Sequence, residues 1–406
     1  MLPNKANLPL TFETINTIGR GLEKAHLNPI RLDADILCLS AMKQTGLMDF
    51  GYDYFQEGLY RLVDSLLRDA NLHYFGKIIT QRVILNYLTQ RLLFAEYKKT
   101  KGEGNTHLNS PIFVTGIPRS GTTFLHRMLS LDQQNENVPF WRLYRPFPHP
   151  NKNDNRRKIA RQEINLRRPA YPEMDTKHFI REDEGEECIW MTGITLSSIV
   201  FWVLAPVASY AKWIFQQDRH FYYKEYRELL QAQQQYYPTK SLVLKAPDHT
   251  PNVDVLLAEI PDARIIQLHR DPTTCLTSLN SLFYSTHKSV STDLNPQRIG
   301  EINQLMYFHY LNRNEAAKKT INLSNSVFDV QYQQLVGNPL DTVKLIYQHF
   351  GIPFSEEFEQ QLNSYVNQNK KNRYGKHNYG PEQFGQNKEE LQQFFQHFFP
   401  NEVIKC

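Results

Sequence analysis

The stretch from Pro111 to Asp132 constrains the fold more than any other part of the chain. A short apolar run of β-favouring residues, Ile112 to Val114, leads into a loop bounded by Gly116 and Gly121. A helical pattern follows, with apolar residues recurring on one side at Phe124, Leu125, Met128 and Leu129. The stretch therefore predicts a strand, a tight loop and a helix.

The predicted junction between strand and helix is suited to binding an anion. The first amides of a helix have no intrahelical partner, and the helix dipole adds partial positive charge there. Gly121 allows close backbone approach, Thr122 and Thr123 add hydroxyls, and Arg119 adds a fixed charge. The spacing Gly-x-x-x-x-Gly matches a P-loop, but Thr122 stands where a nucleotide triphosphatase needs Lys. A positive charge inside the loop suits a donor with a single sulfonate group.

The sequence Gly-Ile-Pro-Arg-Ser-Gly-Thr-Thr, residues 116–123, resembles the 5′-phosphosulfate loop of sulfotransferases. These enzymes use 3′-phosphoadenosine 5′-phosphosulfate (PAPS) as the sulfonate donor. The form with Arg is similar to bacterial sulfotransferases and to protein-tyrosine sulfotransferases. An ordinary turn without a ligand is the alternative. The resemblance implies that the donor is held by Arg119, Ser120, Gly121, Thr122, Thr123 and the aromatic ring of Phe124.

A second predicted strand, beginning at Ser241, ends at Lys245, with His249 four residues further on. Ligands of parallel α/β sheets meet the carboxyl ends of the strands. Sulfotransferases place a Lys, often followed by a catalytic His, at the equivalent strand end. The resemblance implies that Lys245 and Arg119 stabilise charge on the transferring group and that His249 removes the acceptor's proton.

Later segments resemble the rest of a PAPS site. Arg270 ends a predicted strand, and Ser278 lies in the helix after it; the family uses such a pair for the 3′-phosphate. Tyr332 stands where the family has a Tyr near adenine. A basic loop near the end of the chain resembles the loop that closes over the 3′-phosphate, although a solvated tail is the alternative. Its candidate residues are Arg373, Gly375 and Lys376.

The base has several candidates besides His249. His178 and the acidic residues from Glu182 to Glu187 gather just before an apolar segment, and the stretch Gly185-Glu-Glu-Cys resembles a Pro-Glu-Glu-Cys stretch of the bacterial family. Related enzymes commonly have Trp-Glu where this chain has Trp141-Arg142. The base therefore stays open between His249, His178 and these acidic residues.

The segment from Cys188 to Ala211 contains no charged residue and is long enough to span a bilayer. Pro206 and several polar residues dilute it, and it has no basic flank. It predicts a buried helical segment lining a pocket for a lipophilic alcohol, phenol or lipid. Membrane insertion of the segment and an ordinary place in the core are the alternatives, and a peripheral membrane contact of the protein also stays open.

Residues 1–108 show helical periodicity without a competing strand pattern, which predicts a helical N-terminal region before a sulfotransferase domain at 109–406. This region is expected to pack on the domain or to form a homodimer contact. The net charge of +4 without a dense Lys/Arg stripe argues against nucleic acid as a partner. Four widely spaced cysteines and the lack of a signal-peptide pattern predict a cytoplasmic protein.

Together these patterns predict an α/β fold: a P-loop-like parallel sheet flanked by helices, with an N-terminal helical layer. The predicted reaction moves a sulfonate from PAPS to a hydroxyl or amine of a small molecule or lipid and needs no metal. A P-loop kinase is one alternative, although the triplet His269-Arg-Asp fails as a kinase motif because Leu276 replaces the required Asn. A non-catalytic adenosine-phosphate binder is the other alternative.

Overall fold

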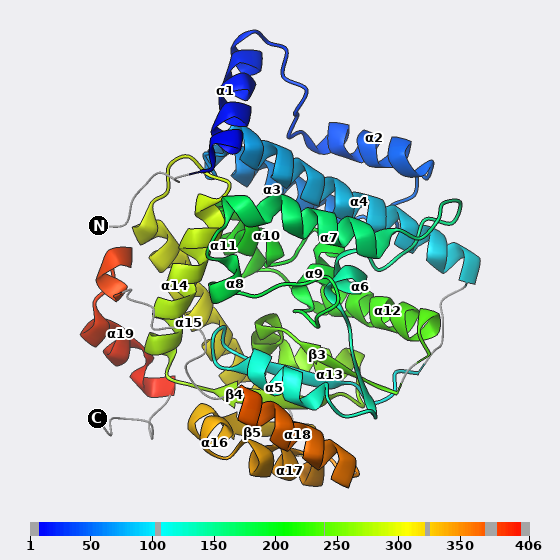
Figure 1. Cartoon of the computed structure of the whole chain (residues 1–406), viewed down its shortest axis with the longest axis vertical. Helices are drawn as coiled ribbons and strands as arrows, with labels where there is room; N and C mark the ends of the chain where they lie inside the picture. The colour runs from blue at the N-terminus through cyan, green and yellow to red at the C-terminus, as the bar shows by residue number, and fades with distance from the viewer. Residues whose placement is uncertain (1–7, 102–106, 239, 321–324, 370–379, 399–406) are drawn as a thin grey trace.

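A parallel five-stranded sheet, with strand order β2-β3-β1-β4-β5, lies in the lower half of the molecule as drawn in Figure 1. The computed structural model describes residues 8–101, 107–238, 240–320, 325–369 and 380–398. Because every neighbouring pair is parallel, the carboxyl ends of the strands meet at one edge. The strands are β1 (Ile112–Gly116), β2 (Asn135–Asn137), β3 (Ser241–Lys245), β4 (Arg264–His269) and β5 (Val327–Gln331).

The two faces of the sheet bury separate apolar clusters because side chains alternate along each strand. On β1, Ile112 and Val114 pack in the smaller cluster and Phe113 packs in the larger one. Burial on both faces explains why the strands read as apolar runs. The smaller cluster is covered by α5 (Thr122–Leu129), α16 (Tyr332–Gly337), α17 (Pro339–His349) and α18 (Glu356–Gln368).

The other face carries most of the remaining helices. After β3 come η3 (Pro247–Asn252) and α13 (Val253–Glu259), and after β4 come α14 (Pro272–Lys288) and α15 (Pro296–Thr320). The side chain of Asp271 caps α14 by accepting hydrogen bonds from the amides of Thr273 and Thr274, and Pro272 is the first residue of the helix. Both residue types favour a helix start at this point of the sequence. Near the end of the chain lie η4 (Pro381–Phe384), α19 (Lys388–Phe395) and η5 (Gln396–Phe398).

The predicted N-terminal helical layer is confirmed and lies at the top of Figure 1. Its helices share one apolar cluster with the body of the protein, for example Leu62 with Phe201 and Phe113. The domain boundary near residue 108 and the homodimer stay predictions. The layer consists of α1 (Leu10–Lys24), α2 (Ala34–Thr45), α3 (Phe55–Arg68) and α4 (Tyr74–Lys101).

A long helical insertion between β2 and β3 fills the space between this layer and the sheet (Figure 1). The predicted apolar segment 188–211 is buried and helical but is broken into short helices, and Pro206 separates the last two. Within the described ranges, no helix combines the length and the apolar content that crossing a membrane requires. The insertion contains α6 (Phe140–Tyr144), α7 (Arg156–Arg167), η1 (Arg168–Ala170), α8 (Met174–Lys177), α9 (Ile189–Thr192), η2 (Gly193–Thr195), α10 (Val200–Leu204), α11 (Ala208–Ile214) and α12 (His220–Tyr236).

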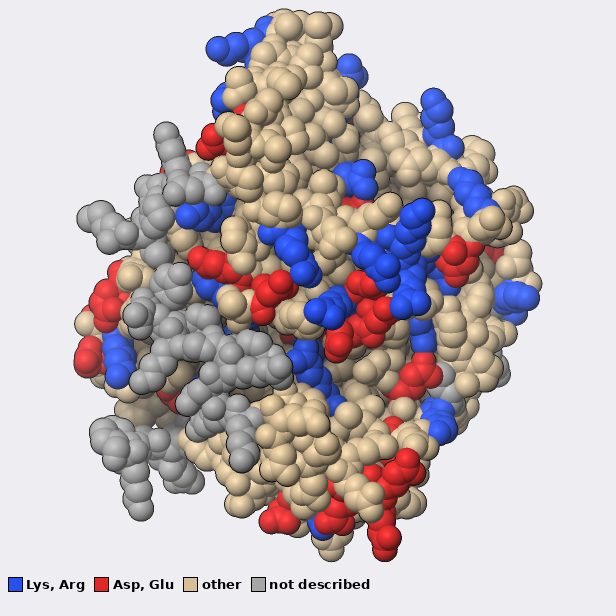
Figure 2. Space-filling model, in the orientation of Figure 1, with Lys and Arg blue, Asp and Glu red and all other residues tan. Residues whose placement is uncertain are grey.

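Several arginines of the basic run at residues 156–168, on and just after α7, pair with neighbouring acidic residues. Arg157 pairs with Asp183 and Arg161 with Glu182, and the guanidinium of Arg168 lies 3.2 Å from Asp175. Figure 2 shows positive and negative side chains interspersed on this face. These three arginines therefore belong to a surface of paired charges rather than to a single-sign patch.

Candidate active site

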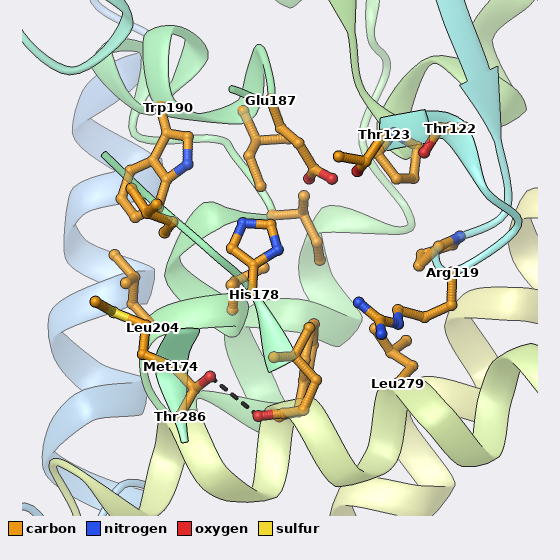
Figure 3. Close-up of a pocket in the computed structure, with 18 of the residues that line it drawn as sticks. Arg119, Thr122, Thr123, Met174, His178, Glu187, Trp190, Leu204, Leu279 and Thr286 are labelled. Carbon is orange, nitrogen blue, oxygen red and sulfur yellow. Dashed lines mark hydrogen bonds between the residues drawn. The ribbon is translucent and has the colours of Figure 1, made fainter. Parts of the chain in front are cut away.

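A cavity of about 960 Å³ reaches from the carboxyl edge of the sheet into the helical insertion. Figure 3 shows Arg119, Thr122 and Thr123 on one side of it and Trp190 and Leu204 on the opposite side. His178 and Glu187 project between the two sides. The cavity therefore joins a polar end at the strand-to-helix loop to an apolar end among helices.

The loop before α5 leaves room for an anion at the helix N-terminus. Gly121 has φ +103°, and a Cβ there would lie 2.9 Å from the ring of Tyr332. No side chain caps α5, so its first amides are available to a ligand. Arg119 also has a positive φ of 70°, which costs energy for a residue with a Cβ. These features fit the phosphosulfate group of PAPS.

Arg119, Arg270, Ser278 and Tyr332 converge beside this loop. The Nε of Arg119 donates to the hydroxyl of Ser278 at 3.1 Å, and Arg270 donates to the Arg119 carbonyl at 2.9 Å. The guanidinium of Arg270 also lies 3.9 Å from the ring centre of Tyr332. These bonds hold the backbone and the side chain of Arg119 in place. Two arginines and an aromatic ring on one wall suit a nucleotide with two phosphates.

The structure brings most of the predicted donor residues together, and their role in binding stays a prediction. Ser120 does not line the cavity, because its side chain is fully buried behind the loop. Arg373, Gly375 and Lys376 lie outside the described residues. The residues that do line the cavity are Arg119, Gly121, Thr122, Thr123, Phe124, Arg270, Ser278 and Tyr332.

Lys245 lies directly behind the polar end of the cavity. It ends β3, is fully buried, and donates to the hydroxyl of Thr123 at 3.1 Å and to the carboxylate of Glu187 at 3.3 Å. Thr123 and Glu187 both line the cavity. The backbone amide of Cys188 donates to the Lys245 carbonyl at 2.8 Å, which ties the acidic segment to the strand end. A positive charge and a carboxylate therefore meet where the two ends of the cavity join.

Glu186 and Glu187 have different surroundings although they are adjacent. Glu186 is buried and pairs with His178, whose Nε2 lies 3.2 Å from its carboxylate. Burial by itself raises the pKa of Glu186, but the nearby charges of His178 and Lys245 outweigh it and hold this pKa below its ordinary value. Glu187 instead faces the cavity. The pair thus supplies one structural carboxylate and one that can reach an acceptor.

The structure does not bring His249 to the cavity. The η3 turn after Lys245 directs its ring into the core, where it is 1% exposed and packs on Phe113 and Tyr226. Its Nδ1 shares a hydrogen bond with the hydroxyl of Tyr223 at 2.9 Å, and burial lowers the pKa of His249 to about 4. An acceptor in the cavity is therefore out of reach of this imidazole.

Arg142, which replaces the Glu of related enzymes, also points away from the cavity. It is buried, pairs with Glu136, donates to Gln233 at 3.1 Å and lies over the ring of Tyr237. The neighbouring Phe140 does line the cavity. The replacement of Glu by Arg at position 142 therefore affects contacts in the core rather than the wall of the cavity.

The apolar end of the cavity has walls from several elements. The prediction that the segment 188–211 lines a hydrophobic pocket is confirmed by Ile189, Trp190, Phe201 and Leu204. The N-terminal layer also contributes, which the sequence did not reveal because cavity-lining and core residues have the same apolar pattern. Its contribution from α3 and α4 consists of Leu62, Leu66, Phe75, Ile79, Thr80, Val83 and Ile84.

Similarity to known proteins agrees with this geometry. Two curated relatives, from Mycobacterium bovis and Mycobacterium tuberculosis, are named omega-hydroxy-beta-dihydromenaquinone-9 sulfotransferase Stf3. Each is 25% identical over 279 residues, which cover 63% of this chain and 66% of the relative. The chain therefore matches slightly less than two thirds of the length of these relatives.

The fold is shared with solved structures. Sulfotransferase STF1 from Mycobacterium tuberculosis H37Rv is similar with a TM-score of 0.74 and 30% identity, over 90% of this chain and 98% of that one. Sulfotransferase STF9 from Mycobacterium avium shares the fold with a TM-score of 0.80 at 24% identity, over 93% and 98% of the two chains. The sequence model described as the sulfotransferase family matches residues 111–356. The predicted α/β fold and the resemblance are thus both confirmed, and this chain belongs to the sulfotransferase family.

Proposed function

We propose that this chain transfers a sulfonate group from PAPS to a hydroxyl group of a lipophilic acceptor. The observation that carries the proposal is one continuous cavity that joins the loop before α5 to an apolar chamber, with Glu187 lining it and hydrogen-bonded to Lys245. A relative named for an omega-hydroxylated menaquinone derivative supports an acceptor of this class.

In the proposed step, the acceptor oxygen attacks the sulfur of PAPS and forms a new S–O bond. The S–O bond to the 5′-phosphate breaks, and adenosine 3′,5′-bisphosphate leaves with the bonding electron pair. Arg119 and Lys245 stabilise negative charge on the transferring group and on the leaving phosphate. The carboxylate of Glu187 takes the proton of the acceptor hydroxyl, since it is the cavity-lining carboxylate next to Lys245.

The test is transfer of radiolabelled sulfonate from PAPS to a panel of long-chain alcohols, phenols and hydroxylated quinones. Lys245→Met is expected to lower the turnover rate by about 10²- to 10³-fold, the usual effect of losing one stabilising donor. Lys212→Met, at an exposed position on α11, is the matched control and is expected to keep the wild-type rate. Equal rates for both variants would contradict the proposed role of Lys245.

The same assay separates the alternatives. A kinase requires magnesium and ATP, whereas the proposed transfer is expected to continue at full rate after chelation of magnesium. Tight binding of adenosine 3′,5′-bisphosphate without any sulfonated product across the panel would instead favour a non-catalytic binder.

A further inference from the structure

The apolar end of the cavity contains a polar cluster, Tyr144, Glu163 and Arg167, that the transfer step does not use. All three residues line the cavity. Among the described residues, no hydrogen-bond partner is found for the Tyr144 hydroxyl, the Glu163 Oε2 or the Arg167 Nε, although these atoms are buried. Tyr144 is only 1% exposed and Glu163 only 7%. Buried polar atoms are nearly always hydrogen-bonded, so a ligand group is the natural partner of this cluster.

The polar cluster lies away from the donor loop. The Tyr144 ring packs edge-on against Trp190 with a centroid distance of 6.1 Å. Figure 3 shows Trp190 across the cavity from Arg119, Thr122 and Thr123. Arg82 of the N-terminal layer donates from its Nε to the Oε1 of Glu163 at 3.1 Å. The Oε2 of Glu163 is left for another partner. A molecule that touches both the donor loop and the cluster must therefore extend through the apolar part of the cavity.

The chemistry of the polar cluster defines the group that it fits. Burial raises the pKa of Tyr144 to about 12, so its hydroxyl keeps its proton and donates. The Nε of Arg167 is also a donor, whereas the carboxylate oxygen of Glu163 is an acceptor. A ligand hydroxyl matches this set, because its oxygen can accept from Tyr144 and Arg167 while its proton is donated to Glu163. The wall around the cluster includes the apolar side chains of Val83 and Ile164.

We propose that the acceptor carries a second hydroxyl at the far end of an apolar body, and that Tyr144, Glu163 and Arg167 bind this hydroxyl. The inference rests on the proposed function, since it identifies the class of acceptor as a lipophilic molecule with two separated polar ends. The distance between the polar cluster and the donor loop then selects acceptors by length.

The test compares α,ω-diols with 1-alkanols of the same chain length. Their affinities are measured by calorimetry with adenosine 3′,5′-bisphosphate present, which makes binding independent of turnover. The diols are expected to bind about fivefold more tightly at one best chain length, the effect of one additional hydrogen bond. The 1-alkanols are expected to show no such optimum.

Variants then identify the residues responsible. Tyr144→Phe removes only the hydroxyl and is expected to erase the preference for the diol while leaving the 1-alkanol affinity unchanged. Arg167→Met, at a half-exposed position, is expected to act in the same direction. Tyr226→Phe is the control, because this buried tyrosine does not line the cavity.

The outcomes separate this inference from the proposed function. Equal affinities for diol and alkanol in the wild type, or equal losses for both in Tyr144→Phe, would overturn the second-hydroxyl site even if sulfonate transfer occurs. A diol preference that depends on Tyr144 would support the site even if no transfer from PAPS is detected, and in that case only the proposed reaction would fail.

Discussion

At the scale of single residues, the contact between Lys245 and Glu187 is the centre of the proposed chemistry. The Lys245 ammonium has no exposure and lies 3.3 Å from the Glu187 carboxylate, so each charge compensates the other at the cavity wall. In the proposed step, Glu187 accepts the proton of the acceptor hydroxyl and Lys245 stabilises the developing negative charge. The two roles require the two residues to act together.

Replacing Glu187 by Gln removes the proton acceptor and keeps the size of the side chain. The turnover rate is expected to fall about 10²- to 10⁴-fold, the usual contribution of a general base. Affinity for adenosine 3′,5′-bisphosphate, measured by calorimetry, is expected to stay the same. Glu184→Gln, at an exposed position three residues earlier, is the matched control. Near wild-type turnover of Glu187→Gln would move the base to His178, which also lines the cavity.

At the scale of elements, the junction of β1 and α5 depends on a glycine. A Cβ at Gly121 meets the Tyr332 ring at 2.9 Å, and the φ of +103° disfavours any residue with a Cβ. Gly121→Ala is therefore expected to displace Tyr332 and to weaken binding of adenosine 3′,5′-bisphosphate at least tenfold. Equilibrium titration of the nucleotide measures this effect.

A second glycine provides the control for backbone strain. Gly351 also has a positive φ, +62°, but a Cβ there meets nothing within 4 Å. Gly351→Ala is expected to cost some stability, about 1 kcal/mol in a denaturant titration, without changing nucleotide affinity. If both variants weaken nucleotide binding equally, the close contact of Gly121 with Tyr332 is not the cause.

Helix α4 provides a test of the N-terminal layer as a wall of the acceptor chamber. Val83 is buried and lines the cavity, so Val83→Phe fills part of the chamber. The KM for long-chain acceptors is expected to rise about tenfold, because the loss of several methylene contacts costs this much. The KM for a small phenol and the nucleotide affinity are expected to stay unchanged. A uniform loss for both acceptors would contradict this role of α4.

At the scale of the whole molecule, buried histidines link stability to pH. Burial lowers the pKa values of His126, His249 and His287 to about 4, from an ordinary value of 6.5. Between these values the unfolded chain binds protons that the folded chain does not. Stability is therefore complete above pH 6.5 and is lost as the pH falls toward 4.

Urea titrations at several pH values measure this dependence. The free energy of unfolding is expected to fall by up to about 1.4 kcal/mol per pH unit for each of these histidines. His249→Gln is expected to reduce the pH dependence of the free energy of unfolding by about the contribution of one histidine. The pH dependence of turnover is expected to stay unchanged. A flat stability profile between pH 7 and 5 would contradict this account.

The sequence predicted the parts of the site that local backbone chemistry specifies. The run from Pro111 to Asp132 predicted the strand, the loop and α5 correctly. The apolar run marks the strand, the two glycines bound the loop, and the helical period of apolar residues marks the helix. Arg270 and Ser278 were named because they resemble the family's pair for the 3′-phosphate, and the structure places both side chains against Arg119. His249 shows the limit of this approach. Its sequence distance from Lys245 placed it near the strand end, but the η3 turn buried its ring beneath β1.

The sequence by itself determined the strand, loop and helix at residues 111–132 and the resemblance to the family, because the motifs that carry them are short runs of neighbouring residues. Only the tertiary structure decided that Glu187 faces the cavity, that α3 and α4 form part of the cavity wall, and that Tyr144, Glu163 and Arg167 line it. An apolar residue has the same sequence pattern whether it faces a core or a cavity, and a polar atom becomes unpaired only when distant segments pack around it.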